Sequence, residues 1–98
     1  MMTVTMSKKN TARGKFKVTD HRGLYLVPSV EIVKCATTFK SEVFLTYQKL
    51  SVSAKSLLSI SMLTAVQGAQ IGVKASGEDA EKAVESILQL ANNKFYIQ

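Results

Sequence analysis

The alternation of apolar and polar residues predicts four short strands. Residues 16–19 alternate in this way, and residues 42–47 are rich in β-branched and aromatic side chains. Residues 50–54 alternate again after a short gap, so the two segments form a hairpin, although Gln48-Lys49 lacks the usual Asn-Gly turn. Residues 69–75 supply the fourth strand.

Apolar residues at helical spacing predict the helices. The first helix covers residues 29–39, with a stripe made of Val30, Val33, Cys35, Ala36 and Phe39. Ser56 stands before a short apolar run, which is typical of a helix N-cap. Residues 80–91 form an amphipathic helix after a turn. The order β-α-β-β-α-β-α predicts an α+β fold, in which a four-stranded antiparallel sheet carries three helices on one face.

Size and charge predict one domain and a tail. The chain has 98 residues and a formal net charge of +6. The first fifteen residues contain several basic side chains and no acidic one. We therefore expect residues 1–13 to be a polar, basic and disordered N-terminal tail, and residues 14–98 to be a single domain. The hydrophobic content of 46% argues against disorder of the whole chain.

Several classes of function are excluded or disfavoured. No apolar run is long enough to span a membrane, and the start lacks the core of a signal peptide, so we expect a cytoplasmic protein. Cys35, the only cysteine, lies in an apolar stripe and is expected to pack there. A lone His21 and scattered acids give no metal-ligand spacing, and no cofactor motif is present, so we expect neither metal nor cofactor.

The segment between the first strand and the first helix places one side chain at a helix start. Gly23 can take a positive φ and supplies the turn, and Pro28, the only proline, fits the first helical turn. Tyr25 therefore lies where unpaired N–H groups of the helix collect, and such a place attracts phosphate. His21 and Arg22 flank it.

Nucleic-acid binding is the weakest alternative. The chain is small and basic, and residues 13–18 (RGKFKV) faintly resemble an RNA-recognition strand. Lys15 and Lys17 stand where such a strand carries the aromatic side chains that stack on bases. A small basic nucleic-acid-binding module is therefore the least favoured of the alternatives.

Four segments in register resemble the HPr family, the histidine-containing phosphocarriers of the bacterial sugar phosphotransferase system. Residues 23–29 (GLYLVPS) match Gly-[Leu/Ile]-His-x-Arg-Pro-Ala, and residues 55–61 (KSLLSIS) match Lys-Ser-Ile-Met-Gly-Val-Met. Residues 67–71 and 75–80 resemble the family's Lys-Gly-Ala-Glu-Ile and Ala-Ser-Gly-x-Asp patterns. The likeness covers about residues 16–90 without gaps and implies an open-faced β-sandwich.

The chain departs from the family at its phosphate site. Tyr25 stands at the position of the active histidine, and Val27 replaces the arginine that stabilises the phosphate. The resemblance therefore implies that histidine-type phosphotransfer is absent. Ser56 matches the serine that HPr kinase/phosphorylase modifies, so the chain is similar to the catabolite-repression branch, which lacks the histidine and keeps this serine.

We expect a regulatory protein rather than an enzyme. Its docking surface is expected to comprise Arg22, Val27, Val30, Lys34, Leu57 and Leu58. The partners that the resemblance implies are HPr kinase/phosphorylase, with enzyme I or a transcription regulator as further candidates, and no membrane. The alternative is a working phosphocarrier that uses Tyr25 or His21 as its acceptor.

Overall fold

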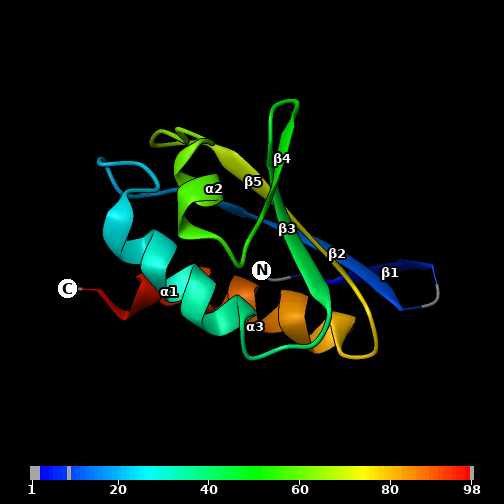
Figure 1. The fold of residues 1–98 in the computed structure, drawn as a ribbon. Coiled ribbons are helices and arrows are strands. Elements are labelled where there is room, and N and C mark those ends of the chain that lie inside the picture. Colours follow the sequence, from blue (N-terminus) through cyan, green and yellow to red (C-terminus); the bar gives the residue numbers. More distant parts are fainter. Residues whose placement is uncertain (1–2, 9, 98) are drawn as a thin grey trace.

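Five strands form one antiparallel sheet in the computed structural model, which describes residues 3–8 and 10–97. The strands are β1 (Thr5–Lys8), β2 (Thr11–Lys17), β3 (Glu42–Tyr47), β4 (Leu50–Ser53) and β5 (Gln70–Ser76). They lie in the order β1-β2-β5-β3-β4 (Figure 1), and every neighbouring pair is antiparallel. The predicted hairpin turn joins β3 to β4, and Gln48 within it has a φ of +56°.

The sequence predicts four strands, and the structure has one more. The additional strand, β1, lies in residues 5–8 and pairs with β2, which itself begins at Thr11. Residues 5–8 and 11–13, which the sequence assigns to a disordered tail at 1–13, therefore belong to the sheet. Val4 also packs against the core. The sequence around β1 does alternate, with Val4 and Met6 between polar residues, but the alternating segment is short. An edge strand of this kind is held mainly by backbone hydrogen bonds that any sequence can make.

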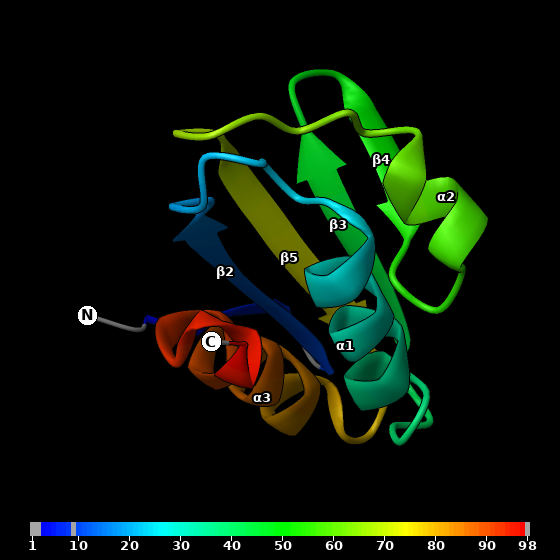
Figure 2. The same ribbon diagram turned by 90° about the vertical axis from the view of Figure 1, so that its left-hand side faces the viewer.

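The helices cover one face of the sheet, as predicted. They are α1 (Leu26–Ala36), α2 (Leu57–Ser61) and α3 (Ala80–Asn92), followed by the 3₁₀ turn η1 (Lys94–Tyr96). Figure 2 shows α1 and α3 in front of the strands, with α2 beside α1 and β4. No described helix covers the other face, so the fold is an open-faced sandwich. Among the described residues, no helix is long and apolar enough to cross a membrane.

Helix α1 begins and ends three residues earlier than its apolar stripe predicts. Tyr25 is its N-cap, with an extended backbone, and Thr37 is its C-cap. Ile32 and Ala36 are fully buried, whereas Cys35 and Phe39 are only partly buried against the core. Burial raises the pKa of the Cys35 thiol, which agrees with the predicted packing role.

The core lies between the sheet and α1 and α3. Alternate residues of the strands point inward, including Phe16, Val43, Leu45, Ile71 and Val73, and α3 adds Ala83, Val84, Ile87 and Leu88. These side chains form one continuous cluster. The β2–α1 turn and α2 are thereby fixed at the same end of the molecule.

Candidate functional site

The β2–α1 turn is fixed by a close approach between two loops. Gly23 has a φ of +73°, and its N–H donates to the Asp20 carbonyl over 2.9 Å. The next N–H, that of Leu24, donates to the Ala65 carbonyl over 2.9 Å. A Cβ atom at Gly23 would collide with that same carbonyl. Glycine is therefore required here for its backbone conformation and for its lack of a side chain.

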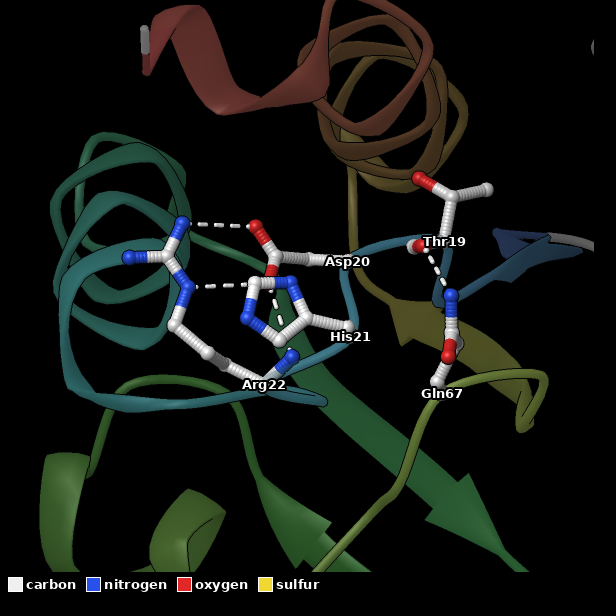
Figure 3. A network of polar contacts seen from close by, with 5 residues as sticks. All are labelled: Thr19, Asp20, His21, Arg22 and Gln67. Atoms are coloured by element: carbon white, nitrogen blue, oxygen red, sulfur yellow. Dashed lines mark hydrogen bonds and ion pairs between the residues drawn. The ribbon is translucent and has the colours of Figure 1, made fainter.

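Arg22 is bound to a carboxylate in the same turn. Its guanidinium donates from Nε and Nη2 to Asp20 over 2.9 Å and 2.8 Å, and its backbone N–H donates over 2.8 Å (Figure 3). These hydrogen bonds hold the pKa of Asp20 well below its usual range, and those from the Arg22 side chain have the largest effect. The pKa of Arg22 is raised by the same contact. Its positive charge is thus already paired with a carboxylate.

Arg22 also covers Tyr25. The carbon of the guanidinium lies 4.2 Å from the centre of the tyrosine ring, within the range of a cation–π contact. His21 takes no part in the contact between Arg22 and Tyr25. Its side chain is 82% exposed, and its Nδ1 is 3.6 Å from a carboxylate oxygen of Asp20. Figure 3 shows its ring beside Asp20 and Arg22, on the surface of the turn.

The start of α1 has few free N–H groups. Pro28 has none, and the Ser29 N–H donates to the Tyr25 carbonyl. The buried hydroxyl of Ser29 donates to the same carbonyl over 2.8 Å. Leu26 and Val27 therefore supply the N–H groups of the first turn that helical bonding leaves unpaired. The side chain at position 27 is a half-exposed valine, which adds no charge to them.

Ser56 caps α2, as the sequence predicts. Its backbone is extended, and its Oγ accepts a hydrogen bond from the Ser59 N–H over 3.2 Å. The neighbouring Lys55 points elsewhere, because its Nζ donates to the Phe39 carbonyl over 2.8 Å. The Ser56 hydroxyl is therefore held by one backbone group, without help from the adjacent ammonium.

Tyr25 and the two leucines after Ser56 line one groove. The groove lies between the start of α1 and α2, has a volume of about 530 Å³, and is lined by Leu24, Tyr25, Leu26, Ser29, Leu57, Leu58 and Ser61. Leu58 is 76% exposed and Leu57 is 36% exposed. The structure thus brings Tyr25 together with the apolar pair, although they are more than thirty residues apart in the sequence.

The remaining predicted docking residues lie along α1. Val27 is exposed, Val30 is half-buried, and Lys34 is exposed and within 3.5 Å of Glu31. The sequence does not identify three exposed apolar side chains near them, those of Leu26, Met62 and Val66. Leu26 is the first residue of α1, and Met62 is the C-cap of α2. At a helix end, the spacing of apolar residues does not show which side chains face solvent.

A second cavity next to Tyr25 involves the chain's C-terminal segment. It measures about 230 Å³ and has Arg22, Tyr25, Lys94 and Phe95 among its lining residues. Phe95 is held there by an edge-to-face contact with Phe16, at a distance of 6.0 Å between ring centres. No motif marks this segment in the sequence. Within the part of the chain that the structure describes, no cluster of histidine, cysteine or acidic residues is suited to a metal ion.

Comparison with known proteins agrees with this geometry. A family model described as the PTS HPr component phosphorylation site matches residues 12–93. The phosphocarrier protein HPr of Buchnera aphidicola subsp. Acyrthosiphon pisum is 40% identical over 75 residues, which is 76% of this chain and 88% of that protein.

Solved structures lead to the same family. The structure of HPr-C-His from Thermoanaerobacter tengcongensis matches with a TM-score of 0.82 and 27% identity, covering 88% of this chain and 97% of that one. Crh, the Bacillus subtilis catabolite repression containing protein, matches with a TM-score of 0.63 and 32% identity over 85% of this chain and 94% of that one. The chain is therefore a member of the HPr family of the phosphotransferase system.

Proposed function

We propose that this HPr-family protein is a regulator that is phosphorylated on Ser56 and does not carry phosphate on a histidine. The observation that carries the proposal is the contrast between the two sites. Tyr25 has its ring covered by Arg22, whose charge is already paired with Asp20. Ser56 is held at the start of α2, beside the exposed side chains of Leu57 and Leu58.

The chemistry at Tyr25 does not suit phosphate transfer. A phenol is a poorer nucleophile than a neutral imidazole at neutral pH, and its phosphate ester lacks the transfer potential of phosphohistidine. Val27 offers no hydrogen bond to a phosphate, and Arg22 would have to leave Asp20 before it could. We therefore assign Tyr25 a role in contact with partners.

The chemistry at Ser56 suits modification by a kinase. The γ-phosphoryl group of ATP passes to Oγ, ADP leaves, and the hydroxyl proton goes to the kinase. The new group carries a charge of about −1.5 to −2 and can accept from the N–H of Ser59, which already bonds Oγ. Because Lys55 is bound to the Phe39 carbonyl, this charge stays largely unneutralised beside Leu57 and Leu58. Phosphorylation would thus place a negative charge next to the two leucines that line the groove.

The proposed docking surface follows from this arrangement. It comprises the groove with Tyr25, Leu57 and Leu58, extended along α1 by Arg22, Val27, Val30 and Lys34. Partners are HPr kinase/phosphorylase and a protein that distinguishes the modified from the unmodified serine, such as a transcription regulator. The proposal assigns the protein to the cytoplasm and makes it a substrate rather than an enzyme.

Kinase treatment tests the proposal. Wild type, Ser56→Ala and Ser61→Ala are incubated with HPr kinase/phosphorylase and ATP, and the added mass is located by peptide mass spectrometry. We expect one phosphate on wild type and on Ser61→Ala, and none on Ser56→Ala. Ser61 is the matched control, because it is an exposed serine on the same short helix. Equal labelling of Ser56→Ala and wild type would show that another residue is the acceptor.

The alternative, a working carrier that uses Tyr25 or His21, is tested with enzyme I and phosphoenolpyruvate. We expect no phosphoryl label on wild type, neither the acid-labile, base-stable label of a phosphohistidine nor the acid-stable label of a phosphotyrosine. The double variant Tyr25→His/Val27→Arg restores the two side chains of the family pattern and serves as the positive control. Label on wild type that disappears in His21→Ala or Tyr25→Phe would establish the alternative.

A further inference from the structure

The face of the sheet that carries no helices has a row of cations. Because side chains alternate along a strand, Arg13, Lys15 and Lys17 of β2 all point away from the core, and all are exposed. Alternate residues are about 6.6–6.8 Å apart, so the three form a line about 13 Å long. Lys74 of β5 pairs with Arg13 and broadens the line.

These cations have no anionic partners in the described part of the chain. The ion pairs found there join Asp20 to His21 and Arg22, and Glu31 to Lys34. Among the outward positions of β2, β3, β4 and β5, Glu42 is the acidic residue, and it lies opposite Ser76 at one end of the sheet. In Figure 2 the helices cover the near side, so this basic face points away from the viewer.

Next to the cations lie an aromatic side chain and a glycine, Phe44 and Gly72, which together form the platform. Phe44 of β3 pairs with Lys74, which brings a half-buried aromatic side chain beside the positive charges. In the neighbouring row, Gly72 lies between Lys15 and Thr46. A Cβ on Gly72 would have Thr46 as its nearest neighbour at 3.6 Å, so the backbone of β5 is open there. A planar group can lie on this backbone beside the Phe44 ring.

We propose that this open sheet face binds single-stranded nucleic acid. The line of separated cations fits a chain of phosphates better than one small anion, which needs donors that converge on a point. The platform fits an unstacked base, which a double helix does not offer and an acidic peptide lacks. The sequence has few aromatic residues, which argues against a nucleic-acid partner. The strand register answers this objection, because it places Phe44 directly opposite Lys74. The proposal is independent of the proposed function, whose groove lies among the helices.

Binding of a fluorescent fifteen-nucleotide deoxythymidine strand to the full chain, followed by anisotropy, tests the proposal. With three to four phosphates contacted, log K should fall with log salt with a slope of about −2 to −3. The face variant Lys15→Glu/Lys17→Glu should bind at least tenfold more weakly. The matched control Lys49→Glu/Lys82→Glu makes the same change in net charge at exposed positions off this face, and should stay within about threefold of wild type.

Phe44→Leu separates the platform from the charges. It keeps an apolar side chain and removes the ring, so affinity should fall about tenfold with the salt slope unchanged. Circular dichroism of every variant checks that the fold is retained. Equal losses in the two charge variants, a flat salt dependence, or equally tight binding of a duplex or of a glutamate peptide of equal charge would overturn the proposal.

Discussion

Gly23 fixes the turn that places Tyr25 at the start of α1, and it does so through both its backbone and its missing side chain. Gly23→Ala combines a φ of +73° with a collision against the Ala65 carbonyl. We expect a loss of about 2 kcal/mol or more in the free energy of unfolding, measured with urea. Gly68→Ala is the control, because its φ of +91° is similar and no atom lies within 4 Å. It should lose only about 1 kcal/mol. If the two variants lose the same amount, the contact with Ala65 contributes nothing.

The residues that the sequence predicts correctly are those whose partners are close in the chain. Ser56 caps α2 through the N–H of Ser59, three residues away, and the Ser-apolar pattern contains that information. Arg22 is different, because its contacts with Asp20 and Tyr25 depend on the conformation of the whole turn. The groove that joins Tyr25 to Leu57 depends on how α1 packs against α2, which no local pattern specifies.

At the scale of elements, one carboxylate ties the start of α3 to the loop before β3. Asp79 is the N-cap of α3, but its side chain makes no hydrogen bond to the helix. Its carboxylate oxygens instead accept hydrogen bonds from the N–H groups of Lys40 and Ser41, both over 2.9 Å, and from the Ser41 hydroxyl. The Ser41 hydroxyl, followed by the Lys40 N–H, lowers the pKa of Asp79 from 3.8 to about 2. Because the pKa of Asp79 is lower in the folded state than in the unfolded state, the ionised carboxylate stabilises the fold at pH values above 4. This stabilisation is lost as the pH falls from 4 to 2.

Melting temperature against pH checks this contribution. We expect the difference in Tm between wild type and Asp79→Asn to be largest above pH 4 and to shrink between pH 4 and pH 2. Glu78→Gln is the control, because it removes a neighbouring exposed carboxylate and should show no comparable convergence. A constant difference between wild type and Asp79→Asn across this range would contradict the assigned role of the ionised carboxylate.

The sequence predicts the bounds of an element best where that element contributes many side chains to the core. Helix α3 ends within one residue or so of its prediction, because six buried side chains mark its stripe. Helix α1 is displaced, because Leu26 and Val27 are exposed while the Tyr25 cap and Pro28 define its start. The sequence predicts no strand at β1, because its alternating segment is short and it is held by backbone pairing with Ala12 and Arg13 at the sheet edge. Local sequence records burial well and edge pairing poorly.

At the scale of the whole molecule, the sheet separates two surfaces of different chemical character. The helical side carries the core, the groove and the caps, and its exposed side chains around the groove are largely apolar. The open side carries cations that no described carboxylate neutralises. Like charges opposite each other on neighbouring strands destabilise a sheet. The pair of Arg13 and Lys74 therefore lowers the stability of a chain whose net charge is already +6.

Relief of that repulsion is measurable by thermal unfolding. Lys74→Gln removes one member of the cross-strand pair and should raise Tm at low salt by roughly 1–4 °C. Salt screens the same repulsion, so wild type should gain Tm between 10 mM and 500 mM NaCl, and the variant should gain less. Lys49→Gln is the control, because it removes the same charge from the hairpin turn and should leave the salt dependence as in wild type. If both variants respond alike, the total charge of the molecule limits its stability, and the pairing on the open face has no separate effect.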